Sequence, residues 1–83
     1  MELAYTSRAF KDLRGLPAAE RDRLRLALAA YAADPQGRHD VRPIAGRAGH
    51  WRLRSGSWRA LFLVEGDRVL VKRVRHRREA YRD

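Results

Sequence analysis

Cysteine is absent from this chain of 83 residues, and only two of its nineteen basic side chains are lysines. Without thiols the chain has no disulfide, no thiolate metal ligand and no cysteine nucleophile. Its apolar runs are much shorter than the roughly 20 residues that a membrane-spanning helix needs, and no leader-like apolar segment opens the chain. The sequence therefore predicts a cytoplasmic protein without a membrane partner.

Several motifs that would indicate an activity are also missing. There is no glycine-rich phosphate loop, no Gly-x-Ser-x-Gly turn and no zinc-ligand spacing, and His39, His50 and His76 do not form a metal-ligand pattern. The ten acidic residues are scattered among arginines instead of being paired as in a glycosidase. We therefore expect neither a metal nor a cofactor.

Positive charge is what the chain has in excess. It carries 19 basic and 10 acidic residues, a formal net charge of +9. Residues 1–37 hold six basic against five acidic side chains, whereas residues 38–83 hold thirteen against five. Guanidinium groups bind phosphate in a bidentate manner and stack on bases, so the partner is expected to be an anion: RNA, DNA or an acidic protein.

Length and composition predict one domain over residues 1–83. A short strand at 3–5 precedes a helix over 8–14, for which Ser7 is the expected N-cap. A longer helix over 17–33 follows, because its apolar residues recur at helical spacing. The first part of the chain is therefore one strand followed by a helical pair.

The apolar period changes to two in the second part. Three runs, 51–54, 58–64 and 68–74, are typical of strands joined by tight turns. The connecting stretch 36–49, rich in glycine and proline, has room for a short extended piece at 41–44. The pattern predicts an α+β fold in β-α-α-β-β-β order, an antiparallel sheet with the helical pair packed on one face.

Hairpin register divides the strand residues between two faces. With Val64 opposite Val69 and Arg54 opposite Arg59, the core face carries Trp51, Leu53, Ala60, Phe62, Val64, Val69 and Val71. The other face carries Arg52, Arg54, Arg59, Lys72, Val74 and His76 around Leu61, Leu63 and Leu70. Arg73 then falls on the core side, so either it lies at the margin of the sheet or a bulge shifts the end of its strand.

This cationic face has two interpretations. Arginines on a half-solvated sheet are often simply hydrated, whereas like charges that converge across one hairpin destabilise a fold unless an anion binds them. Arg52, Arg54 and Arg59 converge in this way, and no acidic residue of that segment is placed to neutralise them. Anion binding is the favoured interpretation.

Two further residues invite a chemical role. An imidazole exchanges protons near neutrality, so His76 suits an acid or a base, although a lone histidine at a strand end is more often structural. Tyr81 either packs back on the sheet, or stacks on an RNA base and donates a proton. Trp51 is expected in the core, and the role of Trp58 is left open.

Four segments occur in a fixed order along the chain. They are Ser7-x-x-Phe10-x-x-Leu13, Asp34-Pro35, Trp51-Arg52-Leu53-Arg54-Ser55-Gly56-Ser57-Trp58-Arg59 and His76-Arg77-Arg78-Glu79-Ala80-Tyr81-Arg82. In this order they resemble the RelE/ParE toxin superfamily. The resemblance implies a RelE-like fold and a metal-independent endoribonuclease that cuts messenger RNA, commonly at the ribosome, through attack of the 2′-hydroxyl. It also implies a toxin–antitoxin hetero-oligomer with an acidic, partly disordered, RelB-like antitoxin.

The resemblance further implies site residues. Catalytic roles fall to Arg54, Arg59, His76 and Tyr81. Substrate binding falls to Arg52, Lys72, Arg75 and Arg77. Some members have lysines where this chain has Arg52 and Arg54, and arginine is a poor general base because it stays protonated. Either His76 carries more of the proton transfer, or the activity is low. Two alternatives stay open: a ParE-like toxin that inhibits DNA gyrase without cutting RNA, and an inactive nucleic-acid-binding module.

Overall fold

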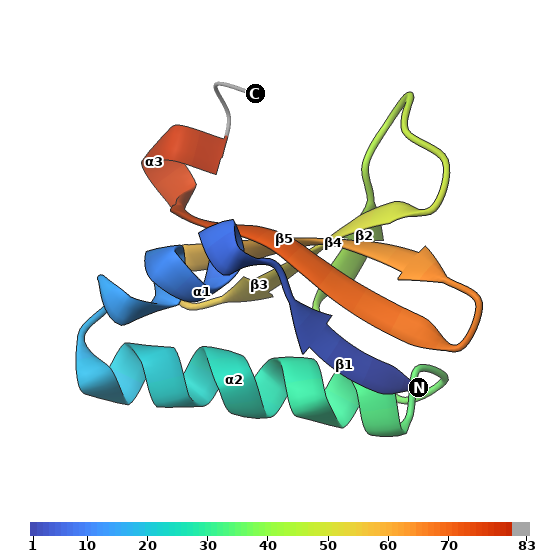
Figure 1. The fold of residues 1–83 in the computed structure, drawn as a ribbon, viewed down its shortest axis with the longest axis horizontal. Helices are drawn as coiled ribbons and strands as arrows, with labels where there is room; N and C mark the ends of the chain where they lie inside the picture. Colours follow the sequence, from blue (N-terminus) through green and yellow to red (C-terminus); the bar gives the residue numbers. More distant parts are fainter. Residues whose placement is uncertain (81–83) are drawn as a thin grey trace.

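Two helices follow the first strand, and four more strands and a short helix follow them (Figure 1). The computed structural model describes residues 1–80. The elements are β1 (Glu2–Tyr5), α1 (Ser7–Arg14), α2 (Ala18–Ala33), β2 (Val41–Pro43), β3 (His50–Ser55), β4 (Trp58–Glu65), β5 (Arg68–His76) and α3 (Arg77–Ala80). The predicted α+β class and helical pair are confirmed, with β2 at the place foreseen for an extended piece and α3 as an addition.

The boundaries of the two helices follow from local hydrogen bonding. The hydroxyl of Thr6 accepts a bond of 3.1 Å from the backbone N–H of Ala9, so Thr6 is the N-cap of α1 and the expectation of Ser7 was wrong by one residue. At the other end, the N–H of Gly15 bonds back to the carbonyl of Asp12. Helix α2 starts after Pro17, which fits because a first-turn N–H has no helical acceptor. In the described part of the chain no helix is long and apolar enough to cross a bilayer.

The strands form one five-stranded sheet in the order β1-β5-β4-β3-β2. The neighbours β2 to β5 pair antiparallel through hairpins, but β1 pairs parallel with β5. The expectation of a wholly antiparallel sheet was therefore wrong at one edge. The reason is topological: the chain leaves β1, forms both helices and returns through three strands before it reaches the strand beside β1.

The register has both predicted pairs, Val64 with Val69 and Arg54 with Arg59. A shift at Leu61 and Phe62 in β4 leaves Lys72 as an extra residue in β5, because Leu61 pairs with Arg73 and Phe62 pairs with Val71. Of the two explanations offered for Arg73, the bulge is therefore the correct one.

The bulge corrects the side assigned to the end of β5. Val74 pairs with Ala60 and is 4% exposed, so it belongs to the core face. His76 pairs with Trp58 and shares that parity, whereas Arg75 pairs with Arg59 on the other face. The prediction that Val74 and His76 lie among the arginines was wrong, because one inserted residue exchanges the faces of all residues beyond it.

The core lies between the sheet and the helices α1 and α2, which cover the same face in Figure 1. Its largest fully buried side chains are Phe62, Leu24, Leu28, Leu53, Val69 and Val71. The ring of Tyr31 from α2 packs 5.1 Å from the ring of Phe62, centroid to centroid. Because these helices occupy one face, the arginines of β3 and β4 are left on the other.

Candidate functional site

Four arginines line one small pocket on the sheet face that α1 and α2 leave open. The pocket has a volume of about 120 Å³, and its lining residues are Arg42, Arg52, Arg54 and Arg59. Strand register explains the convergence, since Arg42 is opposite Arg52 across β2 and β3, and Arg54 is opposite Arg59 across β3 and β4. Side chains opposite each other on antiparallel strands have Cβ atoms roughly 5 Å apart. We call this feature the arginine pocket.

Arg59 is the most enclosed member of the arginine pocket. It is 7% exposed, and its neighbours across the two adjoining strands are Arg54 and Arg75. Taking a guanidinium out of water costs free energy, so a fold retains one where its planar set of donors is used. The rigid strand around Arg59 therefore holds a cation at the centre of a cationic surface.

Arg54 has an acidic neighbour that the local sequence did not suggest. Its Nε atom lies 2.6 Å from a carboxylate oxygen of Asp40, and its backbone N–H bonds to the Asp40 carbonyl at 2.9 Å. The sequence-based expectation that no acid within the hairpin segment neutralises the arginines did not consider Asp40, which lies outside that segment and pairs with Arg54. Both side chains are about half exposed, so the pair adds little stability. A guanidinium has five N–H groups, so one contact orients Arg54 without using up its donors.

His76 does not line the arginine pocket: it ends β5 opposite Trp58, on the side of the sheet to which Ala60 and Val74 belong. Its ring packs edge-on to Trp58, with the centroids 5.2 Å apart, and its Nδ1 atom accepts a hydrogen bond of 3.3 Å from the backbone N–H of Arg78. An Nδ1 that accepts leaves the proton of a neutral ring on Nε2. Trp58, whose role was open, donates from Nε1 to Glu20 at 2.8 Å and thereby ties β4 to α2.

The remaining predicted residues have different positions. Arg52 lines the arginine pocket and Arg75 pairs with Arg59 next to it. Lys72 is exposed at the bulge, and Arg77 is exposed at the start of α3, where its N–H bonds to the Ser57 carbonyl at 2.7 Å. Tyr81 lies outside the described residues. The structure thus brings Arg52, Arg54 and Arg59 together, and sets Lys72 apart.

Arg42 and Asp40 were missed at the sequence level. Asp40 precedes a three-residue strand that pairs with β3, and Arg42 is the middle residue of that strand. A strand this short has almost no periodic signal. The alternation of Val41, half-buried, with Arg42, exposed, is the one signal that would have placed the arginine on the open face. Among residues 1–80, no three histidine, aspartate or glutamate side chains are grouped as metal ligands would be.

A second surface feature lies between β1, α1 and α2. Two adjoining hollows share Tyr5 and Arg25, and the one on the α1 side has a volume of about 200 Å³. Phe10 and Leu26 border them and are 58% and 71% exposed. Burial raises the pKa of the Tyr5 hydroxyl, and the charge of the nearby Arg25 opposes part of that rise. We call these hollows together the Tyr5 groove.

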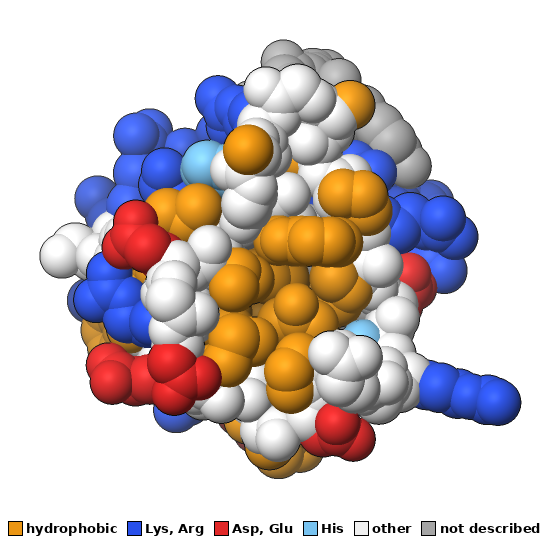
Figure 2. All heavy atoms as spheres, turned by 90° about the vertical axis from the view of Figure 1, so that its right-hand side faces the viewer, with side chains coloured by type: hydrophobic (Ala, Val, Ile, Leu, Met, Phe, Trp, Pro, Cys, Tyr) orange, Lys and Arg blue, Asp and Glu red, His pale blue; other side chains and the backbone are white. Residues whose placement is uncertain are grey.

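Apolar surface is also exposed at the end of the molecule shown in Figure 2. Hydrophobic side chains gather in the middle of that face, while basic and acidic side chains lie around its margins. A contiguous apolar area rimmed by charge is typical of surfaces that another protein covers. This arrangement and the Tyr5 groove both suggest a protein partner in addition to an anionic one.

Comparison with known proteins gives a consistent result along nearly the whole chain. Residues 3–81 match the sequence profile of the family described as the ParE toxin of type II toxin–antitoxin systems, parDE. Toxin RelE3 of Methanocaldococcus jannaschii is 27% identical over 84 residues, which cover 98% of this chain and 96% of that protein.

Solved structures share the fold. A chain of the RelB–RelE antitoxin–toxin complex from Methanococcus jannaschii is 26% identical, with a TM-score of 0.79 over 95% of each chain. The isolated E. coli RelE toxin is 20% identical, with a TM-score of 0.76 over 98% of this chain and 95% of that one. At 20% identity the second likeness bears on the fold alone.

Proposed function

Since the chain belongs to the ParE toxin family of type II toxin–antitoxin systems, and its fold is RelE-like, we propose that it is a toxin that cleaves messenger RNA at the ribosome in the cytoplasm. The observation that carries the proposal is the arginine pocket, in which four guanidinium groups converge on one open sheet face. A single phosphodiester bound there would meet donors from three strands. Charge stabilisation by preorganised donors is usually the largest contribution to such catalysis.

The proposed reaction needs no metal. The 2′-hydroxyl oxygen forms a bond to the adjacent phosphorus and loses its proton to a base, while the bond from phosphorus to the 5′-oxygen breaks and that oxygen gains a proton. Arg52, Arg54 and Arg59 stabilise the charge that develops on the phosphoryl oxygens. Because arginine keeps its proton, proton transfer and base stacking are assigned to His76 and Tyr81; His76 has the parity of the other sheet face, so the RNA would have to reach it around the end of β5.

The outer arginines complete the proposed RNA interface. Arg75 lies across from Arg59 in β5, and Arg77 is the first residue after that strand. We propose that both extend the cationic surface beyond the arginine pocket. Lys72, exposed at the bulge, is proposed as a more distant phosphate contact. Each phosphate contact contributes mostly electrostatic free energy, so RNA binding should weaken steeply with salt.

A second function, inhibition of DNA gyrase without RNA cleavage, is supported by the family profile, which is named for ParE. A protein inhibitor of gyrase needs a docking surface and no reacting groups. A third, inactive nucleic-acid-binding module would keep the basic surface alone. Both alternatives leave messenger RNA intact, whereas the first function cleaves it.

Induced expression in bacterial cells separates the three functions. We expect messenger RNA to be cut within minutes, with breaks mapped inside coding regions by primer extension, and protein synthesis to stop before any SOS response. DNA breaks and an SOS response with intact messenger would establish the gyrase function instead. Normal growth despite verified expression would support the third alternative, an inactive nucleic-acid-binding module.

The proposed protein partner is a RelB-like antitoxin that is acidic and partly disordered. The Methanococcus jannaschii structure similar to this chain is a RelB–RelE antitoxin–toxin complex. We assign the Tyr5 groove to this partner because its lining includes the apolar rings of Tyr5 and Phe10, while Arg14, Arg21 and Arg25 supply positive charge. An amphipathic helix with an acidic face would complement both properties.

Replacement of Phe10 by aspartate should weaken antitoxin binding by about 30-fold or more, because exposed aromatic residues in a groove are frequent hot spots worth ~2 kcal/mol. The measurement is the dissociation constant from isothermal titration calorimetry of the purified toxin with the antitoxin. Gln36→Asp introduces a carboxylate at an exposed position away from the groove and should bind like the unaltered protein. Equal dissociation constants for the two variants would rule out this surface.

A further inference from the structure

The outer edge of β5 is covered by two different elements. Strand β1 pairs with β5 only as far as Tyr5 opposite Val71, whereas β5 continues to His76. An unpaired strand edge would leave backbone N–H and carbonyl groups without partners. Beyond Tyr5 the chain turns into α1, which lies along this second half of β5 (Figure 1).

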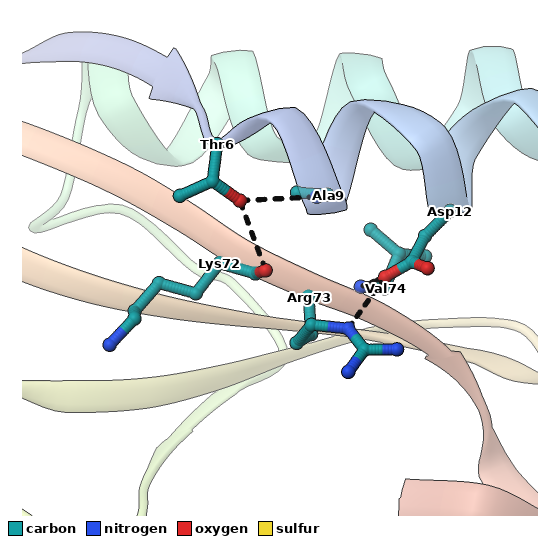
Figure 3. Close-up of polar contacts among 6 residues, drawn as sticks. All are labelled: Thr6, Ala9, Asp12, Lys72, Arg73 and Val74. Carbon is teal, nitrogen blue, oxygen red and sulfur yellow. Dashed lines mark hydrogen bonds and ion pairs between the residues drawn. The ribbon is translucent and has the colours of Figure 1, made fainter.

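Three contacts continue the hydrogen bonding of the sheet edge along α1. The N–H of Thr6 bonds to the Val71 carbonyl at 2.9 Å, and the Thr6 hydroxyl donates to the Lys72 carbonyl at 3.1 Å. One carboxylate oxygen of Asp12 then accepts from the backbone N–H of Val74 at 3.0 Å, where a neighbouring strand would otherwise offer a carbonyl. Figure 3 shows Thr6 and Asp12 beside Lys72 and Val74 of β5.

The same oxygen of Asp12 also accepts from Nε of Arg73, at 2.9 Å. Both side chains are largely shielded from water, at 20% and 25% exposure. Asp12 therefore holds two consecutive residues of β5, Arg73 through its side chain and Val74 through its backbone. These two residues follow Lys72, the extra residue of the bulge.

The bulge decides which side chain of β5 joins the arginines. With the extra residue in place, Arg75 is opposite Arg59 and Val74 is opposite Ala60 in the core. Without it the strand would slip by one, so that Val74 would face the open side and Arg75 the core side. Holding Val74 in its present register therefore also holds Arg75.

We propose that Asp12 is a positioning residue of the RNA site, which acts by fixing the bulge of β5 and thereby the place of Arg75. The inference rests on the proposed RNA-binding function.

Two variants that remove the same negative charge test the proposal. Asp12→Asn keeps an oxygen that can accept from the Val74 N–H, whereas Asp12→Ala has no acceptor. Loss of an acid alone should tighten RNA binding, since the partner is an anion. We expect Asp12→Ala to bind a mixed-sequence 2′-O-methyl RNA oligonucleotide about tenfold more weakly than Asp12→Asn, as befits the misplacement of one phosphate contact. This probe lacks the attacking hydroxyl, so binding is measured apart from cleavage.

Coupling with Arg75 distinguishes positioning from mere loss of stability. If Asp12 acts through Arg75, then in an Arg75→Ala background the RNA affinities of Asp12→Asn and Asp12→Ala should differ by less than about twofold. A full tenfold difference in that background, or equal affinities of the two Asp12 variants in the intact background, would overturn the proposal. Circular dichroism at the assay temperature confirms that each variant is folded.

A structural readout keeps the inference separable from the proposed function. Nuclear Overhauser contacts between the backbones of Arg59 and Arg75 should be present in the unaltered protein and in Asp12→Asn, and should be lost or shifted to Val74 in Asp12→Ala. If the unaltered protein fails to bind RNA, the proposed function fails, and these contacts still decide whether Asp12 sets the register. Unchanged contacts in Asp12→Ala would refute the register argument directly.

Discussion

Replacement of Arg59 by alanine should lower the rate of messenger RNA cleavage by about 100- to 1000-fold, the usual effect of removing one preorganised donor from a developing negative charge. Arg59 is 7% exposed and lies between Arg54 and Arg75, so its guanidinium is both the most desolvated and the most central of the arginine pocket. A charge in such a place acts more strongly than the same charge in water. The measurement is the single-turnover rate on a synthetic messenger bound to ribosomes.

Two comparisons make the Arg59 result specific. Arg59→Lys keeps the charge but loses the planar pair of donors, so its cleavage rate should fall between that of the unaltered protein and that of Arg59→Ala. Arg68→Ala removes an arginine from the far end of β5, where it pairs with Glu65 at 3.6 Å, and should leave the rate within about twofold because surface charge acts weakly at a distance. If Arg59→Ala cuts as fast as the unaltered protein, the arginine pocket is not where cleavage occurs.

Local patterns in the sequence were sufficient for much of the fold. The helical period of 17–33 and the alternation in 58–64 each depend on neighbours within a few residues, so both elements were predicted with bounds close to those of α2 and β4. The hairpin pairs nearest the two turns were also predicted correctly, since a tight turn fixes them, whereas the register of β4 with β5 was wrong beyond the bulge. The parallel pairing of β1 with β5 joins segments more than sixty residues apart, and no local pattern encodes it.

The candidate site was predictable to the same extent. Arg52, Arg54 and Arg59 belong to one hairpin, so alternation alone placed them together. Arg42 and Asp40 reach the same place from a separate short strand and its preceding loop, which requires knowledge of the whole sheet order. That Arg75 and not Val74 is opposite Arg59 depends on a single inserted residue. The acid that bonds to the backbone N–H of Val74, Asp12, lies on a helix far away in sequence.

The arginine pocket and the Tyr5 groove of this small toxin both depend on one hydrophobic core. Strand β4 carries Arg59 on its open face and Ala60 and Phe62 on the face against the helices. The arginines repel one another, which raises the free energy of the folded state. Apolar burial on the other face must offset that repulsion, so the core residues of β4 matter for the site although they touch no substrate.

Replacement of Phe62 by alanine should therefore destabilise the protein by about 3–5 kcal/mol, the usual cost of emptying a fully buried aromatic position. Phe62 is 0% exposed and packs against Tyr31, so its truncation would leave a cavity inside the core. Domains of this length have a free energy of unfolding of only about 4–12 kcal/mol. A substantial part of the total stability would be lost, with a fall in Tm of more than about 12 °C by differential scanning calorimetry.

The other phenylalanine of the chain provides the matched control for that experiment. Phe10 is 58% exposed at the Tyr5 groove, so Phe10→Ala removes the same atoms without opening a cavity, and its effect on unfolding should stay within about 0.5 kcal/mol. Equal losses of Tm in the two variants would mean that Phe62 is not the centre of the core. A large loss for Phe62→Ala alone, accompanied by weaker RNA binding near the new Tm, would connect the core to the arginine pocket through β4.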